Sequence, residues 1–126
     1  MKGEKSMNIV EMLLKNEIEN ETTSELNIKR LSEMCGCDII LKVKNINYNR
    51  MAEIQQMKND NAIHVILEAD TEGVFKNKQL MEKYNAVTPV ELVKKLLFPG
   101  EISKISGEIL YLSGYGNDMI EIVKKK

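Results

Sequence analysis

The sequence predicts a small single domain of the α+β class, dominated by helices and carrying one β-hairpin near its N-terminal third. Its 126 residues match the usual size of one domain. Most apolar residues recur every three to four positions, which is typical of amphipathic helices. Alternation with a period of two, typical of half-buried strands, is confined to residues 25–46. We expect an N-terminal helix and linker in 1–24, a core domain in 25–116, and a flexible or short-strand tail in 117–126.

The N-terminal segment has helical spacing from Met7 to Ile18, and Ser6 is the expected N-cap. Polar residues 19–25 then break the pattern, so we interpret them as a linker that attaches the first helix loosely. The hairpin is expected to pair strands 25–31 and 38–46 through a loop that contains Gly36. In the second strand, Ile39, Leu41 and Val43 are expected to share a face, and Lys42 and Lys44 are expected to point away from it.

Helical periodicity resumes at Asn47 and continues to residue 112. The first helix of this segment is expected to have an apolar stripe of Tyr48, Met51 and Ile54. A second helix is expected from Ala62 to a stop at Gly73, and a short third helix from Lys78 to Tyr84. The last helix is expected to have an apolar stripe of Ile102, Ile105, Ile109 and Leu112. A left-handed stop is expected at Ser113-Gly114. Beyond it, Ile120 and Ile122 suggest a short strand in the tail.

The best local signal is the segment Thr88-Pro89-Val90-Glu91. Thr88 is expected to accept a hydrogen bond from the N–H of Glu91, and the Glu91 carboxylate to accept one from the N–H of Thr88. Pro89 suits the first helical position, where a missing donor costs nothing. Pro99 is expected to end this helix and to begin the next.

Composition and motifs disfavour several classes of function. Eighteen basic and nineteen acidic residues give a net charge of −1, which argues against binding nucleic acid. The sequence has no run of about 18 apolar residues that would span a membrane. His64 is the only histidine and has no ligand or catalytic motif around it. Cys35 and Cys37 are interpreted as reduced thiols, too few for a zinc site. We therefore expect no enzyme activity, cofactor or metal.

Several short motifs, read in order, resemble one known family. They include Asn47-Tyr48 at the start of a helix, Leu80 to Tyr84, Thr88 to Leu92, Leu96 to Ile102, and Leu112 to Gly116. The motif Ile28 to Glu33 precedes them. In this order and spacing, the motifs resemble those of the XkdN-like phage tail assembly chaperones, and the resemblance runs from about Leu26 to Tyr115.

The resemblance implies a non-catalytic chaperone of phage tails, or of tail-like bacteriocin particles, that acts in the bacterial cytoplasm. It implies binding to the tape-measure protein and assistance in assembling tail-tube protein, and it leaves self-association open. Phe98 and Tyr115 are the candidate partner-binding residues, because they stand at helix ends and aromatic side chains are favoured interface anchors. Two alternatives are a small cytoplasmic adaptor or regulatory domain unrelated to tails, and a small-molecule-binding protein or enzyme with an uncommon site.

The last three residues, Lys124 to Lys126, raise one further hypothesis. Many tail assembly chaperones have a longer form made by ribosomal frameshifting, and a run of adenines can encode consecutive lysines. The alternative interpretation is a solvated basic tail. Because lysine codons are ambiguous, the protein sequence does not show whether the gene contains a run of adenines.

Overall fold

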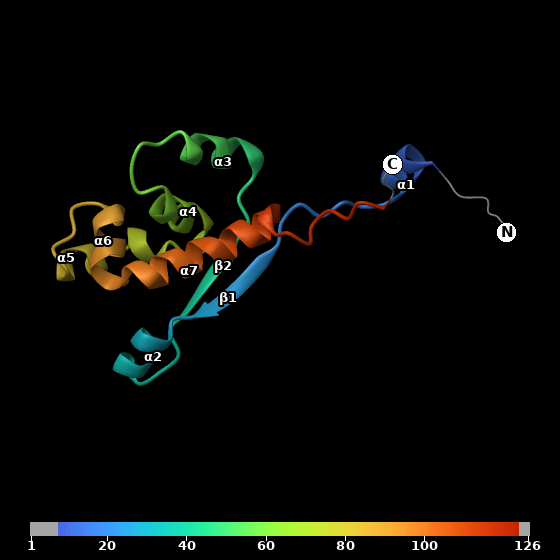
Figure 1. The fold of residues 1–126 in the computed structure, drawn as a ribbon. Helices are drawn as coiled ribbons and strands as arrows, with labels where there is room; N and C mark the ends of the chain where they lie inside the picture. Colours follow the sequence, from blue (N-terminus) through green and yellow to red (C-terminus); the bar gives the residue numbers. More distant parts are fainter. Residues whose placement is uncertain (1–7, 124–126) are drawn as a thin grey trace.

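The computed structural model describes residues 8–123 and confirms a helix-dominated α+β fold with one antiparallel hairpin (Figure 1). Within that range the helices are α1 (Ile9–Lys15), α2 (Lys29–Cys35), α3 (Tyr48–Gln55), α4 (Asn61–Ala69), α5 (Lys78–Lys83), α6 (Pro89–Leu96) and α7 (Pro99–Leu110). The strands are β1 (Thr23–Asn27) and β2 (Ile40–Lys44), and the short turns are η1 (Val74–Lys76) and η2 (Tyr111–Tyr115). No helix of the described chain is long and apolar enough to cross a membrane.

The hairpin pairs β1 with β2 in a register that runs from Thr23 opposite Lys44 to Asn27 opposite Ile40. The predicted first strand, 25–31, is wrong at both ends. The strand begins at Thr23, inside the predicted linker, and beyond Asn27 α2 occupies the connection in place of a loop. Its sequence, Lys-Arg-Leu-Ser-Glu-Met-Cys, consists largely of good helix formers. Gly36, at φ 73°, ends the helix in the left-handed conformation that glycine adopts most easily.

The connection through α2 is held by Ser32, whose hydroxyl joins the ends of the two strands. It accepts a hydrogen bond of 2.7 Å from the N–H of Ile39 and donates one of 2.8 Å to Oδ1 of Asn27. The helix buries none of its own side chains and projects from the rest of the fold (Figure 1). Its position depends on the half-buried Leu31, which packs against the core, and on polar contacts, one of which defines the candidate site below.

The core lies where α4, α6 and α7 meet the inner face of β2. The most deeply buried large side chains are Val43, Ile54, Ile66, Leu92, Val93 and Ile109. The predicted stripe of the last helix is confirmed at Ile105 and Ile109, and its outer members Ile102 and Leu112 are half-buried. Each such aliphatic side chain contributes about 1.5–3 kcal/mol when it is fully buried.

The helices of the middle segment depart from prediction at their ends. In α3, Met51 and Ile54 are buried as expected. Tyr48, the first helical residue, is 86% exposed, and at 100° per residue it lies about 120° around the helix from Ile54. Helix α4 ends at Ala69, before the expected stop at Gly73. The cause is Asp70, whose carboxylate accepts hydrogen bonds from the N–H groups of Glu72 and Phe75. A side chain that satisfies the backbone of a turn competes with continuation of the helix.

The caps of α6 and α7 follow the predicted pattern with one difference. The Thr88 hydroxyl accepts from the N–H of Glu91 at 3.2 Å, and Pro89 is the first helical residue. The Glu91 carboxylate, however, accepts from the N–H of Val87 at 2.8 Å, so its predicted bond to Thr88 is wrong by one residue. Pro99 begins α7 as expected.

The N-terminal helix is shorter than predicted and contributes no side chain to the core. Helix α1 runs from Ile9 to Lys15, with Asn8 as its N-cap, and lies away from the rest of the fold (Figure 1). The predicted cap Ser6 and first residue Met7 lie outside the described residues. The predicted end at Ile18 is wrong, because Asn16 is already extended.

The C-terminal segment leaves α7 through η2, where Gly114 adopts the expected left-handed conformation, at φ 97°. The expected strand in the tail does not form among residues 117–123. Ile120 and Ile122 are instead exposed. Lys124 to Lys126 lie outside the described residues.

Candidate functional site

The chain segment from β1 to the start of α2 lies alongside α7 and runs in the opposite direction. At the C-terminal end of α7, the Thr22 hydroxyl donates a 3.3 Å hydrogen bond to the carbonyl of Leu112. At its N-terminal end, Arg30 binds Glu101. Between these two attachments lies an open groove of about 830 Å³, which we call the α7 groove. Its apolar lining is Leu26, Ile28, Phe98 and Ile105, and Lys104 and Glu108 lie along α7.

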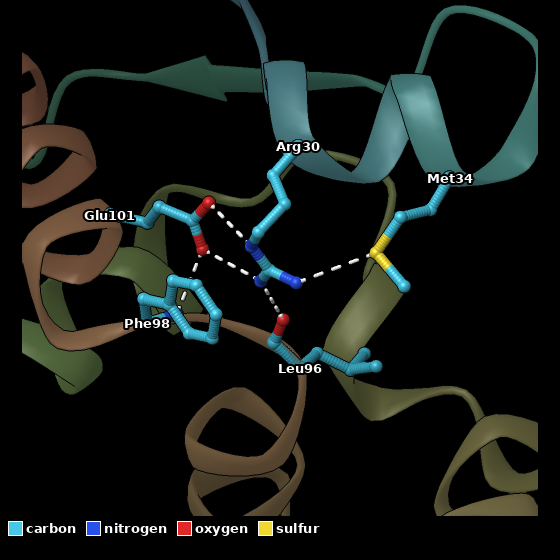
Figure 2. A network of polar contacts seen from close by, with 5 residues as sticks. All are labelled: Arg30, Met34, Leu96, Phe98 and Glu101. Atoms are coloured by element: carbon cyan, nitrogen blue, oxygen red, sulfur yellow. Dashed lines mark hydrogen bonds and ion pairs between the residues drawn. The ribbon is translucent and has the colours of Figure 1, made fainter.

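Arg30 of α2 lies at one end of the α7 groove, where it binds residues of α6 and α7 and also Met34 of its own helix (Figure 2). Its Nε donates to Oε2 of Glu101 at 2.9 Å, and its Nη2 donates to Oε1 of the same carboxylate at 2.8 Å. Nη2 also donates to the carbonyl of Leu96 at 2.8 Å, and Nη1 reaches Sδ of Met34 at 3.7 Å. A single side chain thus joins α2 to the corner between α6 and α7.

Phe98 lies against the same guanidinium group (Figure 2). The guanidinium carbon of Arg30 is 3.8 Å from the centre of the Phe98 ring, which is within cation–π distance. The backbone N–H of Phe98 donates a 2.8 Å hydrogen bond to Oε1 of Glu101. Although it is fixed on one side in this way, Phe98 remains 57% exposed.

The electrostatics of this end follow from the pairing of Arg30 with Glu101. The hydrogen bonds from Arg30 are the main reason that the pKa of Glu101 is lowered, and the N–H of Phe98 adds to the effect, while burial opposes it. The same pairing raises the pKa of Arg30. Because these two charges neutralise each other, the charges that remain along α7 in the groove are those of Lys104 and Glu108.

The two predicted partner-binding residues do not share a site. Phe98 lies at the N-terminal end of α7, in the α7 groove, whereas Tyr115 follows the C-terminal end of that helix. Tyr115 lines a smaller hollow of about 250 Å³ with Tyr48 and Met51. Its hydroxyl accepts a 3.3 Å hydrogen bond from Nε2 of Gln55, and the side chain is 56% exposed.

Sequence reasoning missed Arg30 as a site residue. Its partner Glu101 is 71 positions away along the chain, and no sequence motif indicates that the two residues are in contact. The only local signal was the Pro99-Gly100-Glu101 helix start, which places a carboxylate in the first turn of α7.

A third hollow of about 690 Å³ lies between α4, α6 and α7, and Ile63, Leu97 and Ile102 are among its lining residues. The ion pair between Lys94 and Asp60, at 3.3 Å, crosses its edge. Within residues 8–123, no three His, Cys, Asp or Glu side chains gather as metal ligands. Cys35 and Cys37 are free and exposed, and His64 is half-buried on α4.

The fold and its surface thus define a class: a small helix-dominated α+β protein whose two larger hollows are open grooves with mostly apolar linings. The chain belongs to the family of phage XkdN-like tail assembly chaperone proteins, because the family model matches residues 57–125. This match confirms the resemblance found in the sequence. It contains Phe98, Glu101 and Tyr115, and it begins after β1, α2 and Arg30.

The fold is also found in a solved structure, the crystal structure of the protein YqbN. The two chains superpose with a TM-score of 0.65 and are 22% identical, over 89% of this chain and 100% of that one. The similarity shows a shared fold. No curated protein matches the chain.

Proposed function

We propose that this protein binds the tape-measure protein of a phage tail, or of a tail-like bacteriocin, and assists the assembly of tail-tube protein around it. Membership of the tail assembly chaperone family is the observation that carries the proposal. The role is non-catalytic and is exercised in the cytoplasm of the bacterial host. The physical task is to cover apolar surface on a long helical partner, which would aggregate if left bare.

The α7 groove is the surface that suits this task best. An amphipathic helix placed in an apolar groove is a recurring mode of peptide recognition. The 12 residues of α7 extend about 18 Å at 1.5 Å per residue, which is enough to contact roughly three turns of a partner helix. Phe98 at one end of the groove would be the aromatic anchor. Tyr115, in its separate hollow, would provide a second contact beyond the C-terminal end of α7.

Co-expression with fragments of the tape-measure protein from the same genome tests this proposal. We expect a fragment to stay soluble and to co-purify with this chain. Phe98→Ala should weaken the complex markedly, and Tyr115→Ala should weaken it less. Val87→Ala is the matched control, because Val87 is an exposed apolar residue that lines none of the three hollows. Fragments that aggregate equally with and without this chain, and form no complex, would contradict the proposal.

A further inference from the structure

Helix α1 contributes no side chain to the core, and most of its surface is apolar and exposed. Its large apolar residues are Ile9, Val10, Met12, Leu13 and Leu14, and all are exposed. At 100° per residue they cover roughly 200° of the helix circumference. Glu11 and Lys15 lie on the remaining strip, next to Val10 and Leu14. An isolated helix of this length is marginal in water, so packing against another surface is what would stabilise it.

The charges of α1 match those of α7 in sign and spacing. Glu11 and Lys15 are four residues apart, as are Lys104 and Glu108, so each pair spans about 6 Å along its helix. If α1 lies parallel to α7, Glu11 meets Lys104 and Lys15 meets Glu108. Val10 and Leu14 then face the apolar lining of the groove, and the charged strip lies at its edge. Among the described residues, neither Lys104 nor Glu108 has an ion-pair partner in this structure.

The chain connection permits this parallel placement. Residues 16–22 join α1 to β1 and reach roughly 23 Å when extended, at about 3.3 Å per residue. They end at Thr22, which is bonded to Leu112 at the C-terminal end of α7. Glu108 lies one turn before Leu112 on the same helical segment. Lys15, the α1 residue nearest the linker, therefore has to reach only the nearer end of the groove.

We propose that α1 folds back into the α7 groove of its own chain and occupies it as an internal ligand. A flexible linker this short gives an effective concentration on the order of millimolar, which favours the internal segment over a second copy in dilute solution. A membrane surface is disfavoured because residues 8–22 carry four glutamates against one lysine, a charge that anionic lipids repel. One last step rests on the proposed function, and it alone does so: the tape-measure protein displaces α1 from the α7 groove.

A single tryptophan at position 14 tests the fold-back in the full-length chain. The protein has no tryptophan of its own, and Leu14 is 80% exposed in the open arrangement of Figure 1. For Leu14→Trp we expect an emission maximum shifted to the blue and a severalfold lower quenching by acrylamide than for free tryptophan. Both should be unchanged over a wide dilution series, with a monomeric mass.

Charge reversal then tests the orientation in that background. Lys15→Glu and Glu108→Lys should each raise quenching severalfold, because each places like charges together, and the double variant should restore protection. Lys58→Glu makes the same change of charge as Lys15→Glu, but outside the groove, and should have no effect. A tryptophan exposed at every concentration overturns the proposal. If the tryptophan is buried only at high protein concentration, the groove is occupied by a second copy instead. If the double variant does not restore the protection that Lys15→Glu and Glu108→Lys remove, the parallel placement is overturned. None of these results depends on the tape-measure protein.

Discussion

At the scale of single residues, Arg30 links helix α2 to the corner between α6 and α7. Its guanidinium group makes hydrogen bonds to a carboxylate, a backbone carbonyl and a thioether, and it also stacks on Phe98. Lysine cannot reproduce this arrangement, because it lacks the planar fork that binds a carboxylate through two parallel bonds.

The first prediction is that Arg30→Lys lowers the melting temperature and loosens α2. Hydrogen exchange in α2 should accelerate, because that helix has no buried side chain of its own. Lys29→Arg is the control, since it exchanges a neighbouring cation in the same helix. Equal protection of α2 in the Arg30→Lys variant and the parent would show that the contact does not hold the helix.

The second prediction concerns acid stability. The pKa of Glu101 lies below its ordinary value of 4.5, so its ionised form is favoured by folding. The stability it contributes is complete above that ordinary value and is lost as the pH falls through the lowered pKa of the folded state. Melting temperatures of the parent and Glu101→Gln should therefore differ most near neutral pH and converge in acid.

The removal of Arg30 provides the control for this pH dependence. In an Arg30→Gln background, Glu101→Gln should change the melting temperature little at any pH, because the main cause of the lowered pKa is gone. A gap between parent and Glu101→Gln that widens towards low pH would contradict the assignment.

At the scale of elements, local signals predicted helix starts and buried faces well. The Thr88 cap, Pro89 and Pro99 at first helical positions, and the left-handed Gly114 depend on neighbours within a few residues. The departures have causes that lie outside that range or compete with it. The strand predicted beyond Asn27 became α2 because its residues are largely good helix formers, which compete with the alternating pattern. The placement of α2, by contrast, depends on contacts with Glu101 and Leu96 far along the chain.

The candidate site could be predicted only in its separate parts. Phe98 was found from its position at a helix end, but its partner Arg30 comes from another part of the chain, and the groove between them is a product of tertiary packing. The other predicted residue, Tyr115, lies beyond the opposite end of α7. Sequence position could not distinguish these two places, because both residues simply flank the same helix.

The third prediction tests the buried stripe of α7. Ile105 is 6% exposed, so Ile105→Ala should cost about 2–5 kcal/mol of folding free energy. Ile105→Val, which removes a single methylene, should cost roughly 0.5–1.5 kcal/mol. Denaturant unfolding measures both. An alanine variant as stable as the parent would mean that the stripe is not part of the core.

The fourth prediction tests the α6 cap. Thr88→Ala should cost about 1 kcal/mol, because it leaves the N–H of Glu91 without its acceptor. Thr88→Ser retains the hydroxyl oxygen and should be close to the parent. Equal losses in the two variants would indicate that the methyl group of Thr88, and not the cap, is responsible.

At the scale of the whole molecule, the fifth prediction is that tail assembly does not need the side chains best suited to catalysis or metal binding. Replacing His64 by Gln, and both Cys35 and Cys37 by Ser, should leave particle yield unchanged in a complementation assay. Circular dichroism would confirm that the variant folds. A folded variant that supports no assembly would contradict a non-catalytic role.

The attachment of the N-terminal third to α7 also has a consequence for biosynthesis. A ribosome releases β1 and α2 long before it has made Glu101 and Leu112, to which Arg30 and Thr22 are bonded. The hairpin therefore emerges without α7 beside it, and the α7 groove cannot form until α7 has been translated. Contacts of such long sequence separation form late and slow the overall rate of folding. A nascent chain stalled before Pro99 would therefore have no binding groove, and the protein becomes competent to bind only once α7 has been made.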